Sequence, residues 1–167
     1  VAQRNVAAGC VMFLDLNRFK LINDTLGRTI GDELLRQVAQ RLRDTLREED
    51  LVAHLSGDEF AIGLFDIRQH FEATTVAQKL QTALEAPFLI EGHDLRVGAS
   101  IGISVYPQDG GDGEALLRLA DIAMARAKEA HDNPDQSVAF YSHAMNQGMQ
   151  ERMRIESGLR HALGHGE

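Results

Sequence analysis

The sequence predicts one α/β domain of the α+β kind, in which a mixed central β-sheet is flanked by helices. The first observation is the apolar run of residues 9–16, which is typical of a strand buried on both faces and carries Asp15 near its end. The second is residues 31–46, where leucine and valine recur at helical spacing. The third is the alternation of strand and helix patterns along the chain. With 167 residues, 44% of them hydrophobic, the chain fits one domain with a full core.

The middle of the chain predicts a hairpin followed by a helix. Residues 51–55 and 60–65 are two short apolar runs joined by the polar turn Ser56-Gly57-Asp58-Glu59, a pattern typical of a β-hairpin. Residues 71–86 read as a helix, and Pro87 ends it because proline cannot continue the helical hydrogen bonds.

The last part of the chain predicts more strands and helices. Residues 88–90 and 95–106 read as two strands with Gly92-His93 in the turn between them. A helix over 114–130 and a short strand over 138–141 follow. Within residues 145–163, apolar side chains recur four residues apart, which predicts a final amphipathic helix. We therefore expect a main domain over residues 1–141 and a linker helix over 142–167.

Composition limits the classes of partner and location. A formal net charge of −8 argues against nucleic acid as a partner, because such binding depends on many lysine and arginine contacts to phosphate. The single cysteine, Cys10, lies in the first apolar run, so we expect a buried thiol, no disulfide and a reducing compartment. No apolar run approaches the roughly 20 residues of a membrane helix. We expect a cytoplasmic location, which includes the cytoplasmic part of a membrane-anchored parent.

Acidic side chains stand at two places where ligands commonly bind. Asp15 lies at the carboxyl end of a predicted buried strand, and Asp58 and Glu59 lie at the tip of the predicted hairpin. Each feature alone has an ordinary explanation, a strand end or good turn chemistry. Together they form the kind of oxygen cluster that holds Mg²⁺ beside a triphosphate, so the sequence predicts a metal site if the fold brings them together.

Several short stretches stand in the order and spacing of one known family. They are Phe13-Leu14-Asp15-Leu16-Asn17-Arg18-Phe19-Lys20, Ile22-Asn23-Asp24-Thr25-Leu26-Gly27, Gly31-Asp32-Glu33-Leu34-Leu35, Ser56-Gly57-Asp58-Glu59-Phe60, Ser100-Ile101-Gly102-Ile103-Ser104, Tyr106-Pro107-Gln108-Asp109-Gly110, and Ala120-Asp121-Ile122-Ala123-Met124 with Ala127-Lys128. On these stretches the chain resembles the GGDEF family from about residue 9 to 141. The resemblance implies a nucleotidyl-cyclase-like fold and the diguanylate cyclase reaction, in which two GTP molecules condense to cyclic di-GMP and pyrophosphate is lost.

The same resemblance implies roles for individual residues. Asp15, the carbonyl of Leu16 and Asp58 would hold Mg²⁺ or Mn²⁺, and Glu59 would assist Asp58 in catalysis. The remaining candidates would bind the nucleotide: the guanine edge would be read by Asn23 and Asp32, and the phosphates would be met by Lys20, Gly57 and Lys128.

A product-binding site is also implied. Arg47 and Asp50 stand at the spacing of the family's RxxD inhibitory site, where the arginine would meet a guanine or phosphate and the aspartate a guanine edge. Without the family match, this acidic and basic run would be a solvated helix end.

The implied partners are GTP, cyclic di-GMP and a second copy of the domain, because each domain binds one GTP and the reaction joins two. Residues 145–163 resemble the helix that leads from a GGDEF domain into an EAL phosphodiesterase domain, and the chain starts without methionine. We therefore expect a piece of a tandem protein. Two other hypotheses stand beside the enzyme: a GTP- or cyclic-di-GMP-binding regulator of an attached EAL domain, and a dimerising scaffold without ligand.

Five positions depart from the family pattern. Ser56 replaces a glycine of the signature turn, and His54 replaces an arginine two residues before it. Arg28 stands where a histidine is usual, and Asp132 places a negative charge where an arginine would meet phosphate. Asn17 replaces an aspartate but keeps an oxygen ligand. Whether these changes abolish catalysis is the question that the sequence leaves to experiment.

Overall fold

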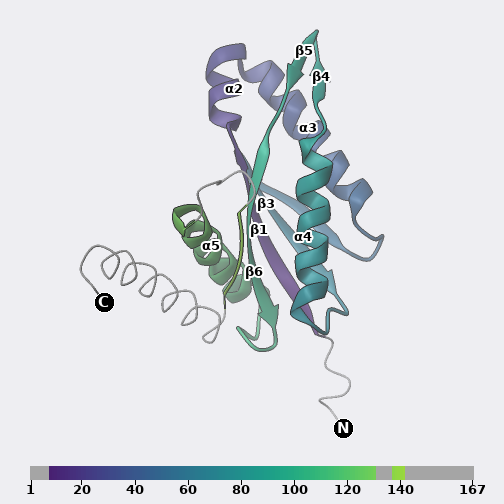
Figure 1. Cartoon of the computed structure of the whole chain (residues 1–167), viewed down its shortest axis with the longest axis vertical. Helices are drawn as coiled ribbons and strands as arrows, with labels where there is room; N and C mark the ends of the chain where they lie inside the picture. The colour runs from purple at the N-terminus through teal and green to yellow at the C-terminus, as the bar shows by residue number, and fades with distance from the viewer. Residues whose placement is uncertain (1–7, 131–136, 142–167) are drawn as a thin grey trace, which may run out of the picture.

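A computed structural model describes residues 8–130 and 137–141 of the chain (Figure 1). The elements, in chain order, are β1 (Gly9–Asn17), α2 (Phe19–Leu26), α3 (Arg28–Thr45), β2 (Leu51–Ser56), β3 (Glu59–Phe65), α4 (His70–Glu85), β4 (Phe88–Ile90), β5 (His93–Leu95), β6 (Gly98–Tyr106), α5 (Gly113–Ala130) and β7 (Val138–Tyr141). The expected linker helix over 142–167 and Asp132 lie outside the described residues. Within the described part, no helix is long and apolar enough to cross a membrane.

The central sheet has five strands in the order β2-β3-β1-β6-β7. β1 is the middle strand and pairs antiparallel with both β3 and β6. β7 pairs parallel with β6, so the sheet is mixed, and the predicted α/β fold class is confirmed. β1 takes the central position because its side chains are apolar on both faces, which only a strand covered from both sides can bury.

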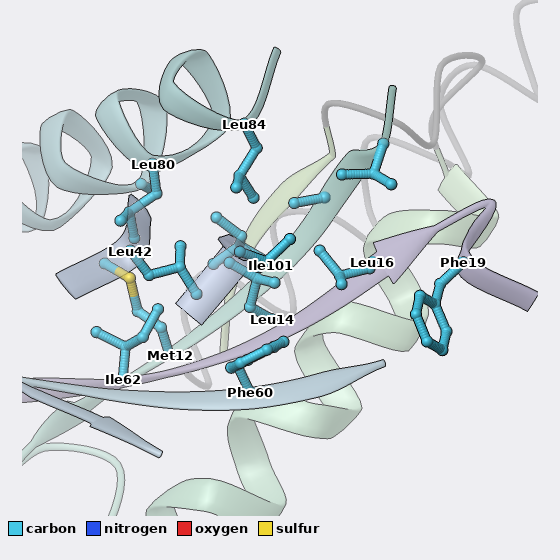
Figure 2. Close-up of a cluster of buried hydrophobic side chains, with 14 of the residues drawn as sticks. Met12, Leu14, Leu16, Phe19, Leu42, Phe60, Ile62, Leu80, Leu84 and Ile101 are labelled. Atoms are coloured by element: carbon cyan, nitrogen blue, oxygen red, sulfur yellow. The ribbon is translucent and has the colours of Figure 1, made fainter. Parts of the chain in front are cut away.

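The larger core lies between one face of the sheet and helices α3 and α4. Met12 and Leu14 of β1 are fully buried there with Leu42 of α3 and Leu80 of α4. Figure 2 shows these side chains meeting between the strands and the helices. Each buried aliphatic side chain of this kind contributes roughly 1.5–3 kcal/mol, so this layer fixes the sheet on which the candidate site stands.

Helix α5 covers the opposite face of the sheet (Figure 1). Phe13 of β1 packs there against Ala120 and Met124 of α5. Gly102 of β6 makes this close approach possible, because a Cβ at that position would overlap the carbonyl oxygen of Ala120 and the amide nitrogen of Met124. The small alanines of α5 and Gly102 together bring the helix close to β1 and β6, and with it the side chain of Lys128.

Four details differ from the sequence prediction. The eight-residue helix α2 was not predicted, and α3 begins at Arg28 rather than at residue 31. The turn between β4 and β5 is Glu91-Gly92, both with positive φ, and His93 belongs to β5. The single strand predicted over 95–106 is two strands, β5 and β6. The last two differences arise because β4 and β5 have three residues each, too few for periodicity to mark a boundary.

Candidate functional site

The end of β1 and the β2–β3 hairpin tip meet, as the sequence predicted. Asp15 stands opposite Glu59 in the β1–β3 register, and the amide of Leu16 donates to the carbonyl of Asp58 at 2.9 Å. Gly57 begins the two-residue turn with φ +49°, a left-handed conformation that glycine adopts without strain. The turn therefore holds Asp58 beside Asp15, although the two residues are 43 positions apart in the sequence.

The two carboxylates repel each other. The pKa of Asp58 is raised to about 6, first because burial disfavours its charge and then because of the charge and hydrogen bonding of Asp15, with Glu59 adding to the effect. The Oδ1 atom of Asp15 is buried and has no hydrogen-bond partner. A pair of carboxylates with an unsatisfied buried oxygen and a disfavoured charge is a chemical environment that a divalent cation would stabilise.

Lys128 reaches this pair from α5. Its Nζ atom lies 2.5 Å from Oδ2 of Asp15, and the two side chains are 33% and 14% exposed. The family resemblance implied that Lys128 contacts the phosphates of a nucleotide, and in the structure it is paired with a carboxylate of the candidate metal site. Within residues 8–130 and 137–141, no three His, Cys, Asp or Glu side chains converge closely enough to hold a metal alone. A cation bound here would therefore need further oxygen ligands.

The packing of α2 on α3 places the side chain of Asn23 against Gly31, the residue before Asp32. Gly31 precedes Asp32, and a Cβ on Gly31 would overlap Oδ1 of Asn23, so the carboxamide occupies the space that a side chain would fill. That oxygen is buried and lacks a hydrogen-bond partner, whereas Asp32 is exposed. The sequence did not single out Gly31 for this contact. Lys20 is exposed on α2.

His54 and Ser56, the two hairpin residues that differ from the family pattern, contact other residues of the hairpin. The Nε2 atom of His54 lies 2.7 Å from the carbonyl oxygen of Gly57, and its ring packs against the ring of Phe60 with a centroid distance of 4.9 Å and a tilt of 37°. The hydroxyl of Ser56 lies 3.4 Å from a carboxylate oxygen of Glu59. Both substitutions thus fit a formed turn.

Asn17 contacts the neighbouring strand. Its amide donates to the hydroxyl of the buried Ser100 at 3.3 Å. The side chain expected to be an oxygen ligand is therefore engaged with β6. Arg28, at the start of α3, is exposed.

Arg47 and Asp50 form a tight loop between α3 and β2. The backbone N–H of Arg47 donates to Oδ2 of Asp50 at 2.9 Å, and its Nε lies 3.6 Å from the same atom. Asp50 is only 3% exposed, and its charge joins burial in raising the pKa of Cys10 to about 12, burial being the larger cause. Arg47 is 54% exposed and lines a cleft of about 320 Å³ together with Lys79. The exposed member of the pair is thus the arginine.

Comparison with known proteins places this geometry in a family. The model described as "Diguanylate cyclase, GGDEF domain" matches residues 1–134. The chain belongs to the GGDEF family.

Relatives in Pseudomonas aeruginosa are similar over most of this chain. The bifunctional diguanylate cyclase/cyclic di-GMP phosphodiesterase MucR is 40% identical over 92% of this chain and 22% of its own length. The cyclic di-GMP phosphodiesterase NbdA is 40% identical over 92% of this chain and 19% of its length. The chain thus spans about a fifth of these two relatives.

A solved structure also matches. The GGDEF domain of TpbB (YfiN) from P. aeruginosa superposes with a TM-score of 0.78 and 35% identity, covering 89% of this chain and 86% of that one. The expected family and fold are therefore confirmed.

Proposed function

We propose that this domain binds GTP with Mg²⁺ or Mn²⁺ and condenses two GTP molecules into cyclic di-GMP with release of pyrophosphate. The observation that carries the proposal is the carboxylate pair of Asp15 and Asp58, fixed by the Leu16–Asp58 backbone hydrogen bond and faced by Lys128. The family match over residues 1–134 supports it.

In this proposal the metal ligands are Asp15, the carbonyl of Leu16 and Asp58, with Glu59 beside them. When bound, the ion neutralises phosphate charge and lowers the pKa of the attacking 3′-hydroxyl. Its remaining ligands would be phosphate oxygens or water, as Mg²⁺ prefers.

The nucleotide would be held by groups on three elements. Asn23 and Asp32 hydrogen-bond the guanine edge, and the unsatisfied Oδ1 atom of Asn23 supports that role. Adenine would be rejected because it mismatches these donors and acceptors. Lys20, Lys128 and the open backbone at Gly57 would contact the phosphates.

Catalysis would require a homodimer. One chain carries one set of these groups, and the product joins two identical nucleotides, so two domains must face each other around a two-fold axis. Activity should therefore rise more steeply than in proportion to protein concentration.

A second candidate is a regulatory domain that binds GTP or cyclic di-GMP without making product. The observation that favours it is NbdA, which is 40% identical over 92% of this chain and is described only as a phosphodiesterase. In that case residues 142–167 would lead into an EAL domain, the parent would work in the cytoplasm, and the exposed Arg47 would contact cyclic di-GMP.

The deciding experiment is incubation of the concentrated domain with GTP and Mg²⁺, with cyclic di-GMP measured by chromatography. We expect product from the native chain and none from Asp58→Ala, because loss of a metal ligand removes the alignment of the reacting groups. Calorimetry with a non-reacting GTP analogue follows if no product forms. Binding without product would establish the regulator, and binding of neither the analogue nor cyclic di-GMP would refute both candidates.

A second prediction concerns the guanine site. Gly31→Ala should weaken GTP binding about tenfold, because the new Cβ displaces the carboxamide of Asn23 and one or two hydrogen bonds to guanine are lost. Fluorescence titration with a labelled GTP analogue measures this loss.

The control is a double-mutant cycle. In the Asn23→Ala background, the added Gly31→Ala change should leave GTP affinity unaltered, because the displaced group is already gone. Equal losses in both backgrounds would show that Gly31 acts through something other than Asn23.

A further inference from the structure

The ammonium of Lys128 contacts Asp15, one of the two carboxylates of the candidate site. Its Nζ atom lies 2.5 Å from Oδ2 of Asp15, and both side chains are more than half buried. The residue comes from α5, which is pressed against the sheet at Gly102, so the base of the side chain is fixed while its four methylenes leave the ammonium movable. The ammonium of Lys128 is thus a cation of the protein itself, at the place where a bound metal ion is expected.

One ammonium does not complete the site. Asp15 keeps a second oxygen, Oδ1, that is buried and unpartnered, and Asp58 lies beside it with a disfavoured charge. The carboxylates therefore retain attraction for a further cation. However, a divalent ion placed on Asp15 would stand within a few ångströms of the Lys128 ammonium, and like charges at that separation repel strongly at the effective dielectric of a partly buried site.

We propose that Lys128 is the resident counter-ion of the metal site, which holds Asp15 in the empty domain and transfers to the nucleotide phosphates when a divalent cation binds. The proposal rests on the proposed function, since it assumes that Asp15 holds the cation. It gives Lys128 two partners in turn: the Asp15 carboxylate before binding and phosphate after binding.

Coupling between the two ligands follows. A cation alone must push Lys128 into solvent, whereas a cation that arrives with a triphosphate offers Lys128 a new anion. Nucleotide and metal therefore favour each other's binding, by the same factor in both directions. Without nucleotide, Lys128 would neutralise Asp15 and so weaken the binding of free divalent ions until the substrate binds.

The test uses Lys128→Met, which keeps the length of the side chain and removes its charge. Mn²⁺ binding without nucleotide is measured by electron paramagnetic resonance of the free ion. We expect Lys128→Met to bind Mn²⁺ about tenfold more tightly than the native chain, because no ammonium has to be displaced. The same variant should bind the Mn²⁺ complex of α,β-methylene-GTP more weakly, because a phosphate contact is lost. Opposite signs of the two changes are the signature of the proposal.

Two variants serve as matched controls. Arg118→Met removes one positive charge from an exposed position of the same helix and should change neither affinity by more than about twofold. Lys128→Arg keeps the charge and should keep the weak Mn²⁺ affinity. Thermal melting checks that the variants are folded. In chelator, Lys128→Met should melt at a lower temperature than the native chain, and Mn²⁺ should raise the melting temperature of Lys128→Met by more than it raises that of the native chain.

The outcomes separate the two proposals. A native chain that binds the nucleotide complex, together with unchanged or weakened Mn²⁺ binding by folded Lys128→Met, overturns the counter-ion role and leaves the proposed function standing. A native chain that binds neither Mn²⁺ nor the complex overturns both.

Discussion

Gly102→Val should leave the domain largely unfolded, and Gly102→Ala should cost about 3 kcal/mol or more of the free energy of unfolding. A Cβ at Gly102 overlaps backbone atoms of Ala120 and Met124 and stands 2.8 Å from the Cβ of Met124. Backbone cannot rotate away as a side chain can, so α5 must lift from the sheet. Overpacking typically costs 1–3 kcal/mol where side chains adjust and more where they cannot, against a total stability of about 5–15 kcal/mol. Urea denaturation followed by circular dichroism measures the loss.

Gly63 of β3 supplies the matched control. It lies on the same face of the sheet, in the strand next to β1, but a Cβ there would only make ordinary contact with Leu51 at 3.6 Å. Gly63→Ala should therefore change the free energy of unfolding by less than about 1 kcal/mol, since alanine also lowers the entropy of the unfolded chain, which favours folding. Equal losses for the two alanine variants would mean that α5 does not approach β6 as closely as Gly102 indicates.

The fold class was predictable because its central strand carries an unusual signal. Residues 9–16 are apolar on both faces, which indicates a covered middle strand, and β1 is buried from both sides as expected. The hairpin was predictable because a polar four-residue turn separates two apolar runs. In contrast, α2 has only eight residues. Its apolar residues Phe19, Ile22 and Leu26 recur at helical spacing, but the stretch is shorter than the roughly 10–12 residues by which periodicity identifies a helix.

In the candidate site, the proximity of Asp15 and Asp58 was predictable from the sequence, and the contacts around them were less so. Asp15 and Asp58 could be paired from the sequence, because a strand end and a hairpin tip are both places where ligands collect. The ion pair of Lys128 with Asp15 could not, because it depends on how closely α5 packs on β6, and that distance is set by the absence of a side chain at Gly102. The contact of Gly31 with Asn23 could not be predicted for the same reason. A sequence shows that residue 31 is small, but it does not show which side chain packs against it.

Asp58→Asn should stabilise the metal-free domain at pH 8 by about 1–2 kcal/mol and, under the proposed function, abolish cyclic di-GMP formation. The pKa of Asp58 is raised to about 6, mainly by burial and then by Asp15, so its ionised form is less stable in the folded chain than in the unfolded chain. A pKa unit corresponds to about 1.4 kcal/mol, and solvent screening at this partly exposed carboxyl reduces the sum. The melting temperature in chelator should rise by roughly 3–6 °C.

The contribution of Asp58 to the free energy of unfolding depends on pH. Above pH 6 the folded chain bears a charge that its structure disfavours, and below the ordinary aspartate pKa of about 4 the group is protonated in both states. The native domain should therefore gain stability from this group as pH falls through about 6 toward 4, and the advantage of Asp58→Asn should be constant above that window and shrink within it. Asp24→Asn, at an exposed carboxylate of α2, should stay within about 0.5 kcal/mol of the native chain at each pH. A destabilised Asp58→Asn at pH 8 would contradict the burial and the repulsion by Asp15 that disfavour the charge of Asp58. Added Mg²⁺ should narrow the gap, because only the native pair of carboxylates gains from the ion.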